Sequence, residues 1–399
     1  VNATASSVSF GPQSLETLSL SGELRDKNRI SGRLAVNSLV AGEQQLGNLD
    51  YTLAGTLAEN KSTLALTQGV ADVALRASGG WDGKRLTQRF EYGRVQPDGF
   101  DSWQLEQKPE LRVAASGGTM SAHCWTQLDA SLCVEATSWD ADRLQAGLVV
   151  KRFALASLQP LLAEGYSIDG TIDADLNIQR TLAGLQAGIR WRQSRTTLAY
   201  ADDIDSFQTV IDSVHIDLSS DDTKTSLTAS LAGEQGLNLS VTAEVDGSLD
   251  ETSPLRASAR GRMPDIGLLR PLLQRVGKPG ELEGDLTIDL NAGGALGDPL
   301  FKGGATLANG VLGLPAAGVT LREINIEAQS LGTEQLRVTG DLRSGDGKAT
   351  VLGEIRAAEN TDIVADIRIQ GKNLATVRVP DLSVDTSPDL KLFIGKGLF

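Results

Sequence analysis

Aromatic residues and helical patterning are both scarce in this chain of 399 residues. Phe, Trp and Tyr together make up only 4% of it, which is little material for a thick two-layered core. No run approaches the ~18 consecutive apolar residues of a membrane span, and no charged-then-apolar leader with a cleavage site is found. We therefore expect an excerpt or mature fragment whose membrane anchor lies elsewhere.

Basic residues are outnumbered as well. The chain has 37 Lys and Arg against 51 Asp and Glu, a net charge of −14. An acidic surface repels nucleic-acid phosphates and anionic headgroups, so binding to nucleic acid or electrostatic adhesion to a membrane is not expected. The charges are interspersed, which indicates a solvated outer face.

Histidine occurs only twice, which leaves little room for histidine-based catalysis. Ser213, His215 and Asp217 lie at positions i, i+2 and i+4. On a strand such neighbours are about 6.6–7 Å apart, too far for a hydrogen bond of about 3 Å. We interpret them as outer-face residues. Paired carboxylates stay open as an alternative, without any one pair singled out, and we predict that the chain is not an enzyme.

Two segments resemble ligand loops but lack the required residues. The stretch 173–177 has the Asp-x-Asp-x-Asn start of a calcium loop, but Ile178 and Gly184 stand where Gly and Glu are needed. The acidic residues within 202–205 are interpreted as a solvated loop, and 345–348 as a hairpin turn and not a phosphate loop. No metal or cofactor is expected.

The two cysteines lie in the sequence HCWTQLDASLCV. If Leu128-Asp129 is a hairpin turn, Cys124 and Cys133 lie directly opposite each other on an antiparallel ladder. We predict a disulfide, which implies an oxidising compartment. Two free thiols are the alternative, and a metal site is disfavoured because only His123 is near.

The dominant pattern is alternation with a period of two. Two stretches, 226–247 and 349–371, each predict a hairpin with one apolar and one polar face. We predict that the apolar side chains of these hairpins line a groove: Leu227, Leu231, Leu237, Leu239, Val241, Val245, Val351, Ile355, Ile363, Ile367 and Ile369.

A unit of about 110 residues occurs twice. SLQPLLAEG (157–165) and LLRPLLQRVG (268–277) each predict a short helix that begins at the proline and ends before the glycine. VIDSVHIDL (210–218) and TLREINIEA (320–328) match at the same offset. The predicted segments are 1–152 with the cysteine hairpin, 153–262 as repeat one, 263–372 as repeat two, and 373–399 as a truncated further repeat.

Strand after strand exposes one apolar face, and no amphipathic helix is available to cover it. Either the sheet curls until its own side chains fill the interior, or it leaves a long apolar trough suited to acyl chains. We favour the trough. The predicted class is all-β: a long, repeat-built curved sheet, solenoid-like, with an apolar inner face and one or two very short helices.

Several stretches in sequence order resemble the middle region of the TamB family. They are WQLEQKPELRV (103–113), the Cys-Trp pair at 124–125, ASLCVEATSW (130–139), VKRFALASLQPLL (150–162), residues 297–326 and the VPDLSVDTSPDLKLFI ending. The first hundred residues fit mainly by pattern.

The resemblance implies a periplasmic protein anchored in the inner membrane, similar to AsmA-like and bridge-like lipid-transfer proteins, with a β-taco fold. It implies phospholipid transport between the membranes, with acyl chains in the groove. It also implies assembly of outer-membrane proteins, including autotransporters, with the outer-membrane barrel TamA, through regions outside these residues. Alternatives are a β-solenoid scaffold or chaperone that binds outer-membrane protein strands, and a secreted β-helix adhesin or polysaccharide-active enzyme. Aromatic scarcity and the repeat disfavour the β-helix.

Overall fold

A computed structural model of the chain describes residues 1–11, 13–25, 28–42, 44–162, 164–182, 184–201, 206–247, 249–269, 280–333, 335–357 and 363–394. Within these ranges it has 31 strands and four 3-10 helices of three to seven residues, which confirms the all-β class. The chain divides into two compact units. Unit 1 comprises residues 1–163 and 169–189, and unit 2 comprises residues 164–168 and 190–399.

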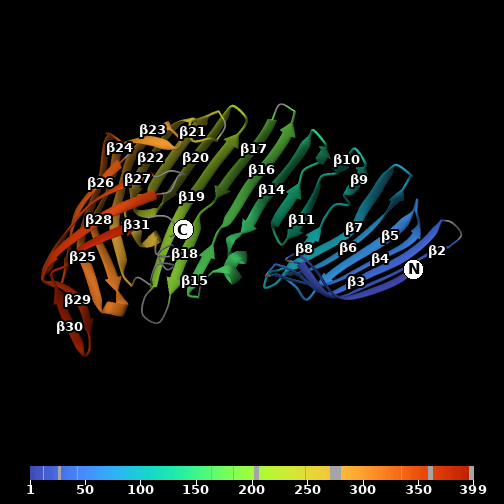
Figure 1. The fold of residues 1–399 in the computed structure, drawn as a ribbon, viewed down its shortest axis with the longest axis horizontal. Helices are drawn as coiled ribbons and strands as arrows, with labels where there is room; N and C mark the ends of the chain where they lie inside the picture. Colours follow the sequence, from blue (N-terminus) through green and yellow to red (C-terminus); the bar gives the residue numbers. More distant parts are fainter. Residues whose placement is uncertain are drawn as a thin grey trace. The chain divides into compact units, whose positions relative to one another are not determined.

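Unit 1 is an antiparallel sheet (Figure 1). Its elements are β1 (Asn2–Phe10), β2 (Gln13–Arg25), β3 (Arg29–Ala41), β4 (Gln44–Thr56), β5 (Asn60–Thr67), β6 (Ala71–Trp81), β7 (Arg85–Pro97), β8 (Trp103–Leu105), β9 (Glu110–Ala114), β10 (Gly117–Met120), β11 (His123–Gln127), β12 (Ala130–Val134), β13 (Thr137–Asp140), β14 (Leu144–Ala154), η1 (Leu155–Leu161), β16 (Thr171–Thr181) and the first part of β17 (Gly184–Gln193).

Strands β1 to β7 each pair with the next one in the chain. Beyond β7 the sheet splits into two rows of short strands. One row runs β7–β8–β11–β12–β14, and the other runs β7–β9–β10–β13–β14. Both rows meet again on β14, which then pairs with β16. The hairpin β11–β12, which contains both cysteines, therefore belongs to one of the two rows of short strands.

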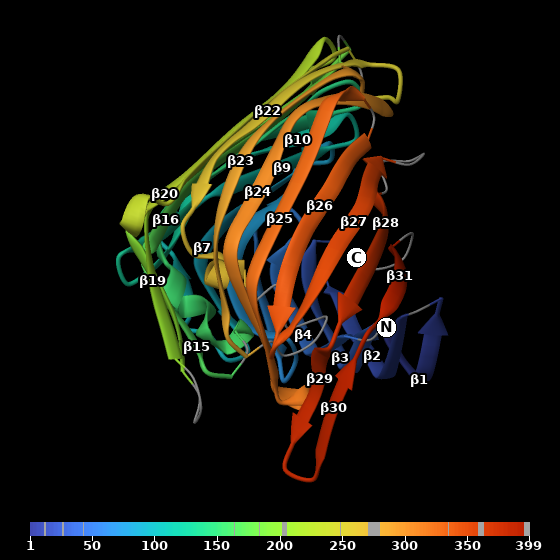
Figure 2. The same cartoon turned by 90° about the vertical axis from the view of Figure 1, so that its left-hand side faces the viewer.

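In unit 2 the strands also pair antiparallel, and they form a curved surface (Figure 2). Its elements are the last part of β17, β15 (Tyr166–Asp169), β18 (Thr196–Ala201), β19 (Ser206–Ser220), β20 (Lys224–Gly233), η2 (Glu234–Gly236), β21 (Asn238–Asp246), β22 (Pro254–Met263), η3 (Ile266–Leu269), β23 (Leu282–Ala295), β24 (Asp298–Leu314), η4 (Pro315–Ala317), β25 (Val319–Thr333), β26 (Gln335–Ser344), β27 (Gly347–Ala357), β28 (Ile363–Lys372), β29 (Leu374–Val379), β30 (Leu382–Thr386) and β31 (Asp389–Ile394).

The strands of unit 2 form a meander from β18 to β28, and β31 pairs with β28. Strands β29 and β30 form a separate two-stranded hairpin, which extends past the ends of β24 and β25 (Figures 1 and 2). The hairpin is held at its base, where the buried Ser344 hydroxyl donates a hydrogen bond of 2.5 Å to the Ala375 carbonyl.

Bulges bend the long strands of both units. Asn309 in β24 has a φ of 54°, and the register of β24 with β25 shifts around it. Its backbone N–H donates to Oδ1 of Asn325 at 3.1 Å. The same device occurs in unit 1, where Ser38 has a φ of 53° and donates to Oδ1 of Asn48 at 2.9 Å. Because a bulge adds one residue to one strand, each such site curves the sheet.

The 110-residue offset is visible in the strand bounds. Adding 110 to the ends of β19, β20, β21 and β22 gives 316–330, 334–343, 348–356 and 364–373, within three residues of β25, β26, β27 and β28. The same shift takes the start of η1 to 265, next to the start of η3. The segment boundaries drawn from the sequence remain predictions.

The first predicted helix is present, but its predicted start is wrong. The helix η1 is a 3-10 helix that begins at Leu155, and Pro160 lies inside it near its end. It begins earlier because Leu155, only 4% exposed, anchors the turn directly after β14. The second predicted helix lies mostly outside the described residues, as do the acidic residues 202–205. Residues 358–362, in the middle of the hairpin predicted at 349–371, also lie outside them.

Candidate apolar groove

One face of unit 2 carries an uninterrupted apolar row across the sheet. Strand register places these residues side by side, from β19 through β28 to β31: Val214, Leu231, Leu239, Gly261, Ile288, Ala305, Ala328, Val338, Gly353, Ile367 and Leu392. Val338 is the only buried member, and the others remain partly or largely accessible. The row is thus apolar without being covered.

The neighbouring row, on the opposite face, is polar along nearly its whole length. It consists of His215, Ser230, Ser240, Arg260, Asp289, Gly304, Gln329, Arg337, Glu354, Asp366 and Phe393. Adjacent charges pair across the strands. Arg260 donates to Asp289 at 3.1 Å, and Lys391 approaches Asp366 at 3.0 Å. The two faces of the sheet are therefore chemically distinct.

The predicted lining residues whose side chains are described share the apolar face of unit 2. Leu231 pairs with Leu239, and Val351 pairs with Ile369. Most of the set is partly exposed, including Leu227, Leu231, Leu239, Ile355, Ile367 and Ile369, and Val241 is 37% exposed. By contrast, Leu237, Val245 and Val351 are only 4–6% exposed and pack inside the protein. The side chain of Ile363 is not among those described, and the role of the set as a groove lining remains a prediction.

Unit 1 contains an apolar hollow that the sequence did not single out. It measures about 360 Å³ and lies over β3 to β7 and β9. We call it the unit 1 hollow, and its lining consists of Ile30, Tyr51, Leu53, Leu57, Asn60, Ser62, Leu64, Leu75, Ala77, Trp81, Leu86, Gln88, Phe90 and Leu111. None of these side chains is charged. The volume is at the lower end of the range of about 300–1,000 Å³ for small-molecule sites.

Two glycines flank Asn60, one of the polar residues that line the unit 1 hollow. Strand register places Gly55, Asn60, Gly79 and Gln88 side by side across β4 to β7. A side chain on either glycine would overlap the backbone of the neighbouring strand. The two glycines therefore allow the neighbouring strands to approach closely at this row. The alternation of apolar residues in β4, β5 and β6 was a signal for this apolar face, but nothing in the sequence located the hollow.

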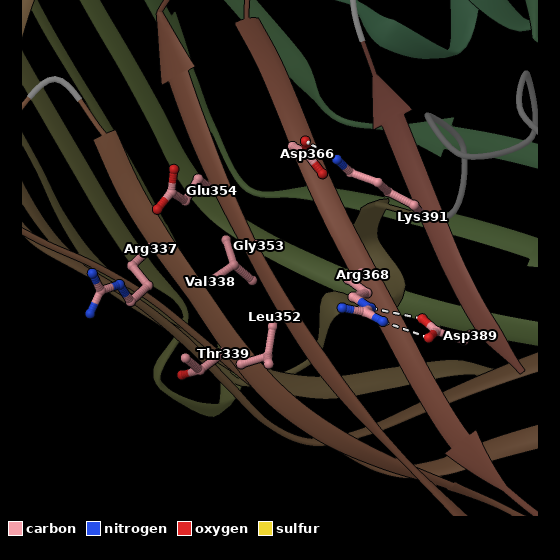
Figure 3. Close-up of a pocket in the computed structure, with 10 residues that line it drawn as sticks. All are labelled: Arg337, Val338, Thr339, Leu352, Gly353, Glu354, Asp366, Arg368, Asp389 and Lys391. Carbon is pink, nitrogen blue, oxygen red and sulfur yellow. Dashed lines mark hydrogen bonds and ion pairs between the residues drawn. The ribbon is translucent and has the colours of Figure 1, made fainter.

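The polar face of unit 2 also carries a hollow (Figure 3). It measures about 700 Å³ and lies over β26 to β28 and β31. Its lining is charged. Arg368 holds Asp389 with Nε–Oδ1 at 2.7 Å and Nη2–Oδ2 at 2.5 Å, and these hydrogen bonds lower the pKa of Asp389 below its ordinary value. Burying apolar chains against solvated, paired charges gains little, so this hollow is a poor acyl site.

The segments that resemble a catalytic triad, a calcium loop and a phosphate loop have the structures that we predicted from the sequence. Ser213, His215 and Asp217 share the polar face of β19, and Asp173 in β16 accepts a hydrogen bond of 2.8 Å from the Arg152 backbone. Residues 345–346 form the turn between β26 and β27. Within the described ranges, no three His, Cys, Asp or Glu side chains gather closely enough to hold a metal ion.

The cysteine hairpin has the predicted register. Strand β11 pairs with β12 so that Cys124 lies opposite Cys133, with the turn at Leu128 and Asp129. The two sulfurs form a disulfide. The bond crosses one of the two narrow rows of unit 1, where the strands are only five residues long.

Comparison with known families identifies the chain. The family model described as "TamB, N-terminal domain" matches residues 1–307, which includes the first hundred residues. The sequence resemblance had pointed to the middle region of that family, so this placement is corrected. No solved structure matches the chain. Among the described residues, no helix has the length and hydrophobicity needed to cross a membrane.

Proposed function

The chain belongs to the TamB family, and on that premise we propose that its apolar face is a groove that carries phospholipid acyl chains between the inner and outer membranes. The acyl chains contact the apolar row of unit 2 and the unit 1 hollow. The headgroups stay in water. The polar face carries the paired charges that keep the sheet soluble.

The apolar row of unit 2 is the observation that carries this proposal. Transfer of apolar surface out of water is worth roughly 25 cal/mol per Å². A sheet that leaves Leu231, Leu239 and Ile367 partly exposed therefore retains surface that an acyl chain can cover. Specific polar contacts are not needed, because the row is uncharged along its whole length. A chain can then slide from one strand to the next at little cost.

We further propose the location and the partner that go with this role. The protein lies in the periplasm and is attached to the inner membrane by a segment outside these 399 residues. The disulfide between Cys124 and Cys133 supports an oxidising compartment. The outer-membrane barrel TamA is the proposed partner, through regions outside this chain, in the assembly of outer-membrane proteins.

Photo-crosslinking tests the groove directly. A photo-reactive residue at Leu231, or at Leu64 in the unit 1 hollow, should capture phospholipid in cells. The matched controls are Ser230 and Thr63, which neighbour these positions on the polar face. Crosslinks from Leu231 and Leu64 that reach only protein would refute the groove.

A second candidate function is a scaffold for outer-membrane protein strands. The observation that favours it is β1, whose described side chains are all exposed and which, among the described strands, pairs along one edge only, with β2. Such an edge can add a strand from another chain. A peptide of alternating hydrophobicity that crosslinks to β1 would support this function. Competition of the same peptide with lipid at Leu231 would place both on one surface.

A further inference from the structure

The unit 1 hollow contains one pair of amide side chains in an otherwise mostly apolar lining. Asn60 is 7% exposed, and its Nδ2 donates to the Thr56 carbonyl at 3.2 Å. Gln88 Nε2 donates to Asn60 Oδ1, also at 3.2 Å. The pair links β5 to β7 across the position of Gly79, which has no side chain.

This arrangement determines which side-chain atom of Gln88 has no hydrogen-bond partner. Because the Asn60 amide nitrogen is committed to the Thr56 carbonyl, the Asn60 oxygen faces Gln88. Gln88 must then present its nitrogen, and its Oε1 is buried with no hydrogen-bond partner. A buried acceptor without a donor is costly and rare in proteins. A ligand that brings a donor would remove that cost.

The surroundings restrict what the donor can be. The lining holds no charged side chain, so a phosphate or ammonium group would be buried without a partner. Leu57 and Trp81 are 47% and 43% exposed, which leaves apolar surface accessible at the edge of the hollow. A peptide would bring an N–H and a carbonyl at each residue, more polar groups than this lining can satisfy. A hydroxyl on an apolar chain brings only one polar group into the hollow.

We propose that the unit 1 hollow binds acyl chains that carry a hydroxyl group, and that this hydroxyl donates to Gln88 Oε1 when the Gln88 side chain rotates towards the hollow. The inference rests on the proposed function, because it assumes that acyl chains enter the apolar face. It adds a preference: among chains of equal length, the hydroxylated chain is retained here. Gln88 is the residue that determines this specificity.

Binding of matched fatty acids to the 399-residue chain tests the preference. Myristic acid is compared with hydroxymyristic acids substituted near the carboxyl end and near mid-chain, all as monomers, by isothermal titration calorimetry. We expect at least one hydroxylated isomer to bind about two- to tenfold more tightly than myristic acid, the contribution of one net hydrogen bond. Gln88→Met should abolish the difference. Thr87→Val, on the opposite face of β7, should retain it.

The outcomes separate the two claims. If the wild-type chain binds all the fatty acids with equal affinity, the proposed preference for hydroxylated chains is wrong, but the proposed groove is unaffected. The same conclusion follows if Gln88→Met still binds the hydroxylated chain more tightly. Absence of any fatty-acid binding would overturn both. Binding of a peptide of alternating hydrophobicity that weakens in Gln88→Met, with no effect of the hydroxyl, would assign the hollow to peptides instead. The wild-type comparison decides the matter even if Gln88→Met fails to fold.

Discussion

Leu231 and Val351 lie on the same apolar face of unit 2 but differ in their access to solvent. Leu231, between Val214 and Leu239, is partly exposed, whereas Val351 is 5% exposed. An aspartate at Leu231 can keep its carboxylate in water if the groove is open. An aspartate at Val351 must bury the charge. The pair of variants therefore distinguishes an open apolar face from a closed core.

The expected magnitudes differ enough to measure. Full burial of a leucine is worth about 1.5–3 kcal/mol, so Leu231→Asp should lose roughly 1–2 kcal/mol of unfolding free energy. Val351→Asp leaves an unpaired carboxylate inside the protein and should lose about 4 kcal/mol or more. Ser230→Asp, on the polar face next to Leu231, controls for the added charge and for the poor strand propensity of aspartate.

Chemical denaturation followed by circular dichroism gives the stability of each variant, and mass spectrometry gives its bound lipid. Leu231→Asp should fold and lose lipid, whereas Ser230→Asp should keep both fold and lipid. If Leu231→Asp destabilises unit 2 as much as Val351→Asp does, the side chain at 231 is part of a closed core and the reasoning fails.

Two further predictions concern the cysteine hairpin and one ion pair. Cys124→Ala/Cys133→Ala should lower the unfolding free energy of unit 1 by about 2–3 kcal/mol, as expected for a short closed loop; an unchanged denaturation midpoint, with and without reductant, would contradict this. The Arg262 guanidinium, with Nε 3.0 Å from both carboxylate oxygens of Asp285, lowers the pKa of that carboxyl. The pair therefore stabilises the fold at neutral pH, and that contribution is lost as the pH falls through the folded-state pKa of Asp285. Arg262→Gln should raise the pKa of Asp285 towards its ordinary value in an NMR titration, and an unmoved pKa would show that the pair is not formed in solution.

Local pairing could be predicted from the sequence because it depends on neighbours in the chain. The alternation in 226–247 fixed which residues of β20 and β21 share a face, and the turn at Leu128 fixed the cysteine register. The pairing of β14 with β16, and the split of the sheet beyond β7, could not be predicted. Both depend on strands that are not consecutive, and the sequence pattern contains no signal for them.

The unit 1 hollow was missed for a related reason. Its lining brings Asn60 and Gln88 into one row, which depends on the register of three successive strands. The buried acceptor on Gln88 depends in addition on the direction of two side-chain amides. The start of η1 was misplaced because the buried Leu155, not the proline, determines where the turn begins.

Mass spectrometry of the lipids that co-purify with the 399-residue chain tests the central claim most directly. The open groove predicts phospholipid in at least a one-to-one ratio to protein, reduced in Leu231→Asp and unchanged in Ser230→Asp. Protein free of lipid after gentle purification, together with crosslinks from Leu231 that reach only neighbouring side chains, would contradict the groove and indicate a closed β-solenoid.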